Sequence, residues 1–377
     1  MKAFILALAT AVPAVRLKQP DIASFMIDSV ATTTAQALFI RSLYERTAIE
    51  ERYSVIEDFN NTKEKWVFWG PLFPYQQPGT KIRNELYKKK ALELAHAAAT
   101  RALDQWGGSP EQISHVISVS CTGVMAPGIE FHLLHSLNLK STTARLGINF
   151  MGCFGGFAAL KVARALAHEN PDNRILIVCT ELCSLHFQTD SSTDTLIANA
   201  LFSDGAAAVV VGGDYKTTEQ PLWEIITTRS AALPNSLDEM SWDAGDTGFI
   251  MKLSNKIPPI IKQHIGSFTT SLLETIDQDA CLWAIHPGGK TIIQAIEQAC
   301  HLNQTQTKAS RSTLKHYGNM SSPSIFFVLD ASRKKQSQYQ WTLGLGFGPG
   351  LSMEGILLKN IGNNNDATTQ TTTRTSI

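Results

Sequence analysis

The 377-residue chain has no excess of either charge, because 33 Lys and Arg residues balance 33 Asp and Glu residues. Proteins that bind nucleic acids normally carry a basic excess, so the sequence predicts no such partner. The chain also lacks an apolar run of the roughly 20 residues that a transmembrane helix needs. With 44% hydrophobic and 18% charged residues, the composition is typical of a globular protein with a large buried core.

The chain has few cysteines, and none of them forms a CxxC pair. The six are Cys121, Cys153, Cys179, Cys183, Cys281 and Cys300. Cys179 and Cys183 lie four residues apart, but no second pair completes a metal site. Most of the six fall inside apolar runs, where a cysteine is usually a small buried hydrophobe. The sequence therefore predicts neither a disulfide framework nor a zinc site.

The N-terminus permits two interpretations. Lys2 followed by residues 4–9 (FILALA) and small residues imitates a short signal peptide. The alternative is a first buried β-strand that ends at Pro13. We favour the strand because the apolar run is short, and we predict a cytoplasmic protein without membrane association.

Strands and helices alternate along most of the chain. Apolar runs predict strands at residues 115–120, 174–179, 206–211, 281–285 and 324–329 and a hairpin formed by 341–345 and 351–358, while helical spacing predicts helices at 85–105, 153–168, 258–276 and 290–300. This alternation is typical of a layered α/β protein with buried central strands.

The predicted elements divide into two βα-rich parts, residues 1–215 and 216–359. The division falls near residues 213–222 and indicates an internal duplication, although no repeat is visible in the sequence itself. The tail, residues 360–377 (NIGNNNDATTQTTTRTSI), has little to bury and is predicted to be disordered.

Cys153 is the first candidate for chemistry. It stands where a loop becomes a helix, within residues 152–156 (GCFGG). Free backbone N–H groups and the positive end of the helix dipole favour a thiolate over a thiol at such a place. The neighbouring glycines allow a substrate to approach the backbone closely.

His286 and Asn319 are the second and third candidates. His286 follows an apolar strand and precedes a Pro-Gly-Gly turn, which is where α/β proteins place active groups. Asn319 follows Gly318 in a loop and can donate two N–H bonds without carrying charge. Taken singly, each residue has an ordinary structural explanation. Together they indicate a thiol nucleophile served by two hydrogen-bond donors.

The chain resembles the type III polyketide synthases, the chalcone synthase and stilbene synthase family of the thiolase superfamily, from about Ala11 to Leu358. The resemblance is carried by residues 152–154 (GCF), 284–289 (AIHPGG), 317–322 (YGNMSS), 346–351 (GFGPGL), 201–208 (LFSDGAAA), 81–87 (KIRNELY) and 124–128 (VMAPG). Overall the sequence looks closer to bacterial members than to plant members.

The resemblance implies a five-layered αβαβα thiolase fold and a homodimer. It implies acyl-CoA starters, extension by malonyl-CoA, and no metal or organic cofactor. It assigns Cys153 as the nucleophile and His286 and Asn319 as its partners. These two residues would donate to the malonyl thioester oxygen and stabilise the enolate left by loss of CO2.

The resemblance also places residues around a substrate tunnel. Phe202 matches a gatekeeper aromatic of the family, and Met251 falls on the second gatekeeper position, with Phe249 close by. The remaining tunnel positions are Cys121, Cys183, His186, Trp242, Ser321, Gly346, Phe347, Gly348 and Pro349. Trp242 falls near a position that is glycine in chalcone synthase, and Cys121 and Cys183 fall on threonine positions of the plant enzymes.

The CoA end of the substrates needs basic or backbone contacts. Arg46 matches a basic position of the family directly, and Arg41 lies one residue from another, where Ser42 stands at the matching site. Gly288 and Gly289 are the other predicted CoA contacts. A solvated helix face explains Arg41 and Arg46 equally well.

The product stays open at this stage. Tetrahydroxynaphthalene-type, alkylpyrone and alkylresorcinol products all fit, and we prefer an aliphatic acyl-CoA starter that gives a pyrone or a resorcinol. Three alternative functions share part of this sequence pattern. They are a ketoacyl-acyl-carrier-protein synthase III, which shares the trio but in different local motifs, a papain-like hydrolase, which has the same Cys-His-Asn order, and a catalytically idle thiolase-fold partner.

Overall fold

The computed structural model describes residues 2–361. Its strands are β1 (Phe4–Ala11), β2 (Val15–Lys18), β3 (Glu51–Ser54), β4 (His115–Ser120), β5 (Ala144–Asn149), β6 (Arg174–Leu182), β7 (Asp204–Gly212), β8 (Trp223–Ala232), β9 (Met240–Gly245), β10 (Gly248–Leu253), β11 (Cys281–Ile285), β12 (Trp341–Gly348) and β13 (Ser352–Asn360). Its α-helices are α1 (Gln19–Val30), α2 (Thr34–Arg46), α3 (Thr80–Trp106), α4 (Ile129–Ser136), α5 (Gly155–Glu169), α6 (Thr193–Leu201), α7 (Ile257–Leu273), α8 (Lys290–Ala299), α9 (Lys308–Tyr317) and α10 (Ser324–Ser332).

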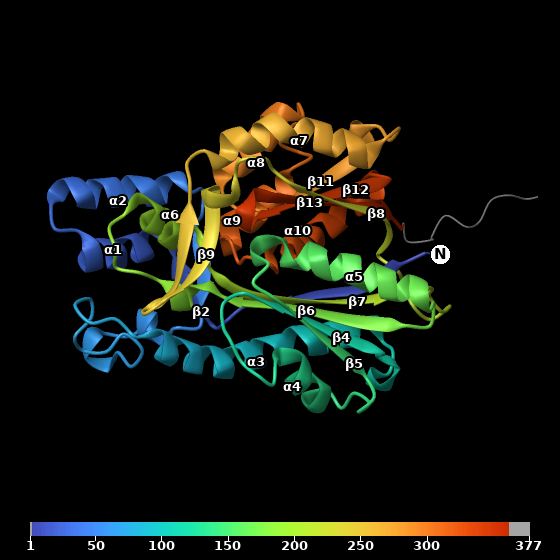
Figure 1. Ribbon diagram of the computed structural model, residues 1–377, viewed down its shortest axis with the longest axis horizontal. Helices are drawn as coiled ribbons and strands as arrows, with labels where there is room; N and C mark the ends of the chain where they lie inside the picture. Colours follow the sequence, from blue (N-terminus) through green and yellow to red (C-terminus); the bar gives the residue numbers. More distant parts are fainter. Residues whose placement is uncertain (1, 362–377) are drawn as a thin grey trace, which may run out of the picture.

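These elements form five layers (Figure 1). Helices α3 and α4 cover one face of a sheet made of β1, β7, β6, β4 and β5, and α7 and α8 cover the outer face of a sheet made of β8, β13, β12 and β11. Helices α5 and α10 lie between the two sheets. Three buried apolar clusters fill the spaces between the layers. The predicted αβαβα layering is confirmed.

The two halves have the same topology. Neighbours run in the order β1-β7-β6-β4 in the first half and β8-β13-β12-β11 in the second. In both orders the first two pairings are antiparallel and the third is parallel. The middle helix of each half joins the two parallel strands, α5 on the way from β4 to β6 and α10 on the way from β11 to β12. The predicted duplication is thus present in the topology, although no repeat is visible in the sequence.

Among residues 2–361, the two sheets are joined through one pair of strands. Phe4 pairs with Glu224 and Ile5 with Trp223, so β1 and β8 join the halves into one continuous nine-stranded sheet. The N-terminal apolar run therefore forms a buried strand in the middle of this sheet, as predicted. No helix among residues 2–361 is both long and apolar enough to cross a membrane.

One predicted strand is wrong. Residues 324–329 (SIFFVL) begin the helix α10 rather than a strand. Residues 324–329 lie in the middle layer and are all buried, so this part of the helix has no polar face to produce a helical period. A short run that is apolar throughout cannot be assigned by periodicity alone. The other predicted strands, the hairpin and the predicted helices are confirmed, with boundaries that differ by a few residues.

The middle helices approach each other closely at Gly156 of α5. A Cβ atom there would lie 2.8 Å from the Phe326 ring and 2.9 Å from the Ser322 carbonyl oxygen. Only glycine fits without a shift of one helix, which explains one of the glycines after Cys153 by packing rather than by chemistry.

The six cysteines are all free and buried. No group of three or more His, Cys, Asp and Glu side chains in residues 2–361 has the geometry of a metal site. The predicted absence of disulfides is confirmed for these cysteines. The predicted tail begins at Asn360, which the structure places at the end of β13, and residues 362–377 lie outside the described part of the chain.

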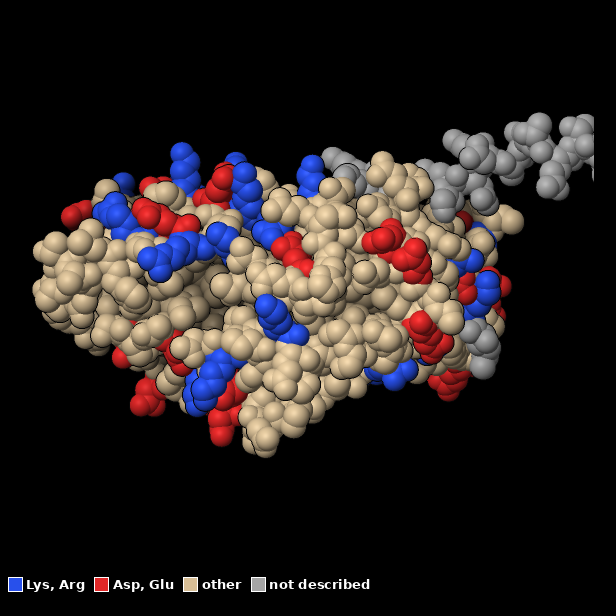
Figure 2. Space-filling view, turned by 90° about the horizontal axis from the view of Figure 1, so that it is seen from above, with Lys and Arg blue, Asp and Glu red and all other residues tan. Residues whose placement is uncertain are grey.

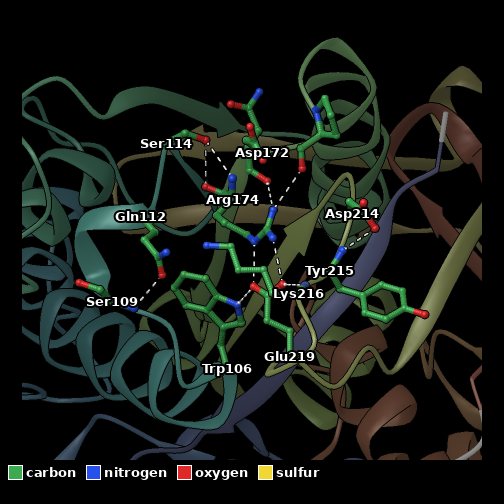
Figure 3. A network of polar contacts seen from close by, with 12 residues as sticks. Trp106, Ser109, Gln112, Ser114, Asp172, Arg174, Asp214, Tyr215, Lys216 and Glu219 are labelled. Atoms are coloured by element: carbon green, nitrogen blue, oxygen red, sulfur yellow. Dashed lines mark hydrogen bonds and ion pairs between the residues drawn. The ribbon is translucent and has the colours of Figure 1, made fainter.

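A buried ion pair holds the segment that links the two halves (Figure 3). Arg174 at the start of β6 donates through Nε and Nη2 to the two carboxylate oxygens of Glu219, each at 2.9 Å. The Trp106 indole N–H donates to the same carboxylate at 2.7 Å, and the Lys216 backbone N–H at 2.6 Å. Burial favours the protonated acid, but these donors outweigh it and hold the pKa of Glu219 below its usual value.

Glu219→Gln is expected to destabilise the fold by about 3–5 kcal/mol, because the variant leaves the Arg174 guanidinium buried without its counter-charge. The measurement is the free energy of unfolding from a denaturant titration. The matched control is Glu57→Gln, because the Glu57 carboxylate is exposed where it pairs with Lys90; this variant should cost less than about 1 kcal/mol. Equal losses for both variants would contradict this account.

Candidate active site

Cys153 and Asn319 occupy corresponding places in the two halves. Cys153 lies in the short 3-10 helix η4 (Gly152–Phe154) that leads directly into α5. Asn319 lies five residues before the start of α10. Since α5 and α10 are the middle helices, both residues enter the interior from the same layer. The backbone of Gly152 has φ +65°, and a Cβ atom there would lie 2.5 Å from Pro349, so this position requires glycine.

His286 and Cys121 also correspond. Cys121 directly follows β4 and His286 directly follows β11, the equivalent strand of the second half. The His286 backbone N–H donates to the Leu345 carbonyl oxygen at 2.8 Å, and the Gly288 N–H donates to the His286 carbonyl oxygen at 2.9 Å. These two hydrogen bonds and the Pro-Gly-Gly turn therefore hold the backbone of His286 in place.

These side chains meet in one cavity of about 300 Å³. Of the residues singled out from the sequence, it is lined by Cys153, His286, Asn319, Cys121, Cys183, Phe202, Met251, Trp242, Ser321, Phe347, Pro349, Gly288 and Gly289. The three candidates for chemistry come from positions up to 166 residues apart in the chain. The tertiary structure thus brings Cys153, His286 and Asn319 to one cavity.

Asn319 is held by contacts on both its backbone and its side chain. Its N–H donates to the Leu201 carbonyl oxygen at 2.9 Å, and its carbonyl oxygen accepts from the Ser203 N–H at 2.9 Å. Its side-chain Oδ1 accepts from the Ser321 N–H at 2.9 Å and lies 4.0 Å from the Cys153 sulfur. Because Oδ1 is occupied in this way, the amide Nδ2 group is the end left to act as a donor. Its one contact is a weak one of 3.4 Å, to the Gly288 carbonyl oxygen.

His286 is buried and neutral. Neither ring nitrogen has a hydrogen-bond partner among the described residues. Burial lowers the pKa of His286 to about 3, so the imidazole keeps one N–H donor and one free acceptor near neutral pH. A buried imidazole without partners is costly in a protein interior, and a substrate oxygen or thiol can supply the missing contacts.

The resting state of Cys153 differs from the sequence expectation. The pKa of Cys153 is raised to about 11, mainly by burial and also by the nearby Glu181 carboxylate, although the hydrogen bonds to Ser321 and Asn319 act in the opposite direction. The start of α5 does not overcome this desolvation, and a neutral His286 supplies no cation. The resting group is therefore a thiol, and its activation requires a base.

Three predicted tunnel residues do not line this cavity. Gly346 and Gly348 face the other way, since a Cβ atom would lie 2.3 Å from Phe157 at the first and 2.4 Å from Phe154 at the second. Their role in the structure is to let β12 approach α5 and η4. The third residue, His186, lines a separate, smaller cavity of about 50 Å³.

His186 belongs to an aromatic group that walls off the smaller cavity. Its ring stacks on Phe249 at 4.5 Å, with the edge of Trp242 5.2 Å away. The Phe249 N–H donates to His186 Nδ1 at 2.9 Å, so Nε2 carries the proton that is donated to the Thr122 carbonyl oxygen at 2.8 Å. Of the two candidates for the second gatekeeper position, Met251 lines both cavities, while Phe249 lines only the smaller one.

The basic residues predicted to contact CoA lie apart from the cavity. Arg41 and Arg46 are exposed on α2, and Arg41 lines a surface groove formed with α1 and β3. Figure 2 shows the face seen from above α7 and α8, where basic side chains are scattered among acidic ones and broad uncharged areas. Gly288 and Gly289 are the only predicted CoA contacts that the structure places in the cavity wall.

Sequence reasoning missed much of the remaining wall. Apart from Gly152, which stands beside Cys153 in its motif, the additional lining residues are Thr122, Ile197, Leu201, Met240, Leu253, Ser254, Asn255, Ile257, Pro258, Ile261, Thr291 and Ile292. Many of these lie just before or within the first turns of α7 and α8, where no local pattern marks them. Glu181 was also missed, although a carboxylate at the end of an otherwise apolar strand was visible in the sequence.

Two family models match the chain. Residues 1–215 match the model for the N-terminal domain of chalcone and stilbene synthases, and residues 224–362 match the model for the C-terminal domain. The curated relative "Probable polyketide synthase 1" from Dictyostelium discoideum is 33% identical over 366 residues, which are 95% of this chain and 11% of that protein. This chain therefore spans only about a ninth of the length of that relative.

Solved structures show the same relationship. The C-terminal type III polyketide synthase domain of Steely1, a type I/III hybrid from Dictyostelium, is 32% identical and superposes with a TM-score of 0.90, covering 96% of this chain and 100% of that one. PKS-I from the brown alga Ectocarpus siliculosus is 29% identical with a TM-score of 0.88, covering 96% and 98%. These relatives give no support to the expected likeness to bacterial members. With both domain models matched in order, the chain belongs to the chalcone and stilbene synthase family, the type III polyketide synthases.

Proposed function

We propose that this chain catalyses decarboxylative Claisen condensation of malonyl-CoA onto an acyl-CoA starter held as a thioester on Cys153. One observation carries the proposal. A single, largely apolar cavity holds a thiol, an imidazole with no partner for either ring nitrogen among the described residues, and an amide with a donor end available. A nucleophile, a base and two hydrogen-bond donors are the groups that this chemistry needs.

The first step loads the starter. Neutral His286 accepts the thiol proton of Cys153, and the sulfur attacks the carbonyl carbon of the acyl-CoA. The C–S bond to CoA then breaks, and the CoA thiolate takes up the proton from His286. A resting thiol with a raised pKa makes this proton transfer necessary, because a thiol is a much weaker nucleophile than a thiolate.

The second step forms the new bond. The N–H groups of His286 and Asn319 donate to the thioester oxygen of malonyl-CoA. Loss of CO2 places the electron pair of the broken C–C bond on the α-carbon and this oxygen, where the two donors stabilise the enolate. The α-carbon then attacks the acyl carbonyl on Cys153, the C–S bond breaks, and Cys153 leaves as a thiolate, which can be acylated again or take a proton from solvent to return to the resting thiol. The scheme uses CoA thioesters as substrates and assigns no role to a metal or organic cofactor.

We propose that the pantetheine arm passes Gly288 and Gly289, which line the cavity. Arg46 and, less directly, Arg41 are proposed phosphate contacts by family resemblance. Because these two arginines lie apart from the cavity wall, the CoA molecule would have to extend over the surface toward α2.

We also propose a cytoplasmic homodimer. The outermost strand β5 supports the dimer, because it is an exposed edge strand followed by the exposed side chains of Phe150 and Met151.

For the starter we propose an aliphatic acyl-CoA and a pyrone or resorcinol product. The main cavity is walled largely by apolar side chains, and the smaller cavity adjoins it across Cys183, Phe202, Trp242 and Met251. A flexible hydrocarbon chain suits such a space, because its burial gains about 0.8 kcal/mol for each CH₂ group.

Phe202→Ser is expected to slow decarboxylation of malonyl-CoA by about tenfold. Phe202 presents an apolar surface to the cavity, which disfavours the charged malonyl carboxylate and favours its loss as neutral CO2. Release of CO2 from labelled malonyl-CoA measures the effect. The control Phe202→Leu keeps the wall apolar and should stay close to wild type. An unchanged rate in Phe202→Ser would count against this role.

The function itself is tested by incubating the purified protein with malonyl-CoA and a panel of acyl-CoA starters, with mass spectrometry of the products. The proposal requires products longer than the starter by two-carbon units. A parallel incubation with malonyl-acyl-carrier protein distinguishes a carrier-dependent synthase III, which would turn over that substrate instead. Release of free acid without elongation would indicate a hydrolase.

A further inference from the structure

Glu181 is a buried carboxylate that the proposed mechanism does not use. It lies near the end of β6, has no exposed surface, and forms no ion pair with any residue of the described chain. Burial raises the pKa of Glu181, while the hydrogen bonds that it accepts act against this shift. A carboxylate buried without a counter-charge is costly, so its surroundings require an explanation.

Five donors from two loops converge on this carboxylate. From the loop after β4, the Cys121 N–H (2.9 Å) and the Thr122 hydroxyl (2.8 Å) donate to Oε2, with the Ser120 hydroxyl more distant at 3.4 Å. The Cys121 thiol donates to Oε1 at 3.3 Å. From the other side, the Ser322 hydroxyl donates to Oε1 at 2.6 Å. Glu181 is therefore the acceptor that joins the β4 loop to the turn before α10.

The Ser322 contact leads to Asn319. Ser321 has φ +59°, a left-handed conformation that is unfavourable for a serine, and its N–H holds Oδ1 of Asn319 at 2.9 Å. Strained residues of this kind persist only where the surroundings hold them. The short bond from Ser322 to Glu181 fixes the residue immediately after Ser321. A chain of contacts thus runs from the Asn319 amide to a carboxylate that does not itself line the cavity.

We propose that Glu181 is a positioning residue that sets the direction of the Asn319 N–H donor through Ser322 and the Ser321 turn. The inference rests on the proposed function, because it assigns the Asn319 amide to the malonyl thioester oxygen. Glu181 acts on the step that needs this donor, which is loss of CO2 from malonyl-CoA. Transfer of the starter to Cys153 needs His286 as base and does not need Asn319 in a fixed orientation.

Ser322→Ala is the sharpest single test. It removes the direct bond from the Asn319 turn to Glu181 and leaves the β4 loop bonded to Glu181, with the Cys121 thiol still 3.5 Å from the Ser321 hydroxyl. Because a displacement of about 1 Å can cost ~10²-fold in rate, we expect malonyl-CoA decarboxylation to fall about 10- to 100-fold. Acylation of Cys153 by a starter, followed by intact-protein mass spectrometry, should change less than about twofold. A general loss of structure would lower both rates.

The matched control is Ser120→Ala. It removes another buried hydroxyl that contacts the same carboxylate, but from the side remote from Asn319. Decarboxylation and loading should both stay within about twofold of wild type. Glu181→Gln keeps the side-chain size and can still accept from the Cys121 N–H while Ser322 reverses its bond, so it should retain more decarboxylation than Glu181→Ala. Equal losses in the Gln and Ala variants would contradict the hydrogen-bond argument.

A double-mutant cycle decides whether the effect passes through Asn319. In the Asn319→Ala background, Ser322→Ala should change the residual decarboxylation rate by less than about twofold. Independent, multiplicative losses would overturn the inference while leaving the proposed function standing. Absence of any elongation or decarboxylation by the wild-type protein would instead refute the proposed function.

Discussion

Cys153→Ala is expected to abolish every product that contains a new carbon–carbon bond. The elongation rate should fall by about 10⁴-fold or more, as it does when a covalent nucleophile is removed. The variant cannot form the acyl thioester, so the malonyl-derived enolate has no electrophile beside it. Decarboxylation of malonyl-CoA should persist at a measurable rate, because His286 and Asn319 remain to stabilise the enolate. The enolate is then protonated, and acetyl-CoA accumulates.

Two measurements check this outcome. Mass spectrometry follows the polyketide products, and release of labelled CO2 follows decarboxylation. Cys300→Ala serves as the matched control, because Cys300 is also free and buried but does not line the cavity. It should elongate normally. Elongation by Cys153→Ala would contradict the assignment of Cys153 as the nucleophile.

His286→Ala is expected to have the second largest effect. In the Cys153→Ala background it should lower decarboxylation by about 10²–10³-fold, the usual loss when one preorganised donor to an oxyanion is removed. In the otherwise native protein it should also stop loading, because the Cys153 thiol loses its base. His286→Gln separates the two roles. Its amide can donate to the thioester oxygen but cannot take the thiol proton, so part of the decarboxylation should return while loading does not.

The pH dependence gives an independent check on His286. Burial lowers its pKa to about 3, so the imidazole stays neutral above that value and gains a proton only as the pH falls through it. Decarboxylation in the Cys153→Ala background should therefore show no step between about pH 5 and 8, where an ordinary histidine with a pKa of about 6.5 would titrate. A sigmoidal change centred near pH 6.5 would show that His286 is charged during catalysis and would contradict the neutral donor.

Local patterns predicted the strands well where the chain passes through a sheet. The runs that form β4, β6 and β11 are short, apolar and bounded by polar or turn residues, and each was assigned correctly. The same reasoning failed for α10, because a helix surrounded by protein has no solvent face and loses the period by which helices are recognised. The error fell in the middle layer, where residues 324–329 of α10 are all buried, whereas α5 keeps exposed positions such as Ala165 and Glu169.

At the candidate site, too, local patterns predicted some features correctly and failed for others. Cys153, His286 and Asn319 were found because each stands beside glycines at the end of an element. Gly346 and Gly348 share that local setting, yet a Cβ atom at either position would point toward α5 or η4 rather than into the cavity. Only the direction of the residue within its strand distinguishes a cavity wall from a packing contact, and a strand reverses that direction at every residue.

From the sequence alone, the hydrophobic period predicted alternating strands and helices in a layered α/β protein, because this period is a local property of the chain. The family and the roles of Cys153, His286 and Asn319 followed from the resemblance of short motifs. The tertiary structure decided what required neighbours from distant segments. It placed Cys153 where burial raises the pKa of the thiol, against the expected thiolate, because desolvation depends on everything packed around the sulfur. It also showed the link from Glu181 through Ser322 toward Asn319, which joins β6 to the turn before α10 across 141 residues. Burial and long-range hydrogen bonds arise only once the chain has folded.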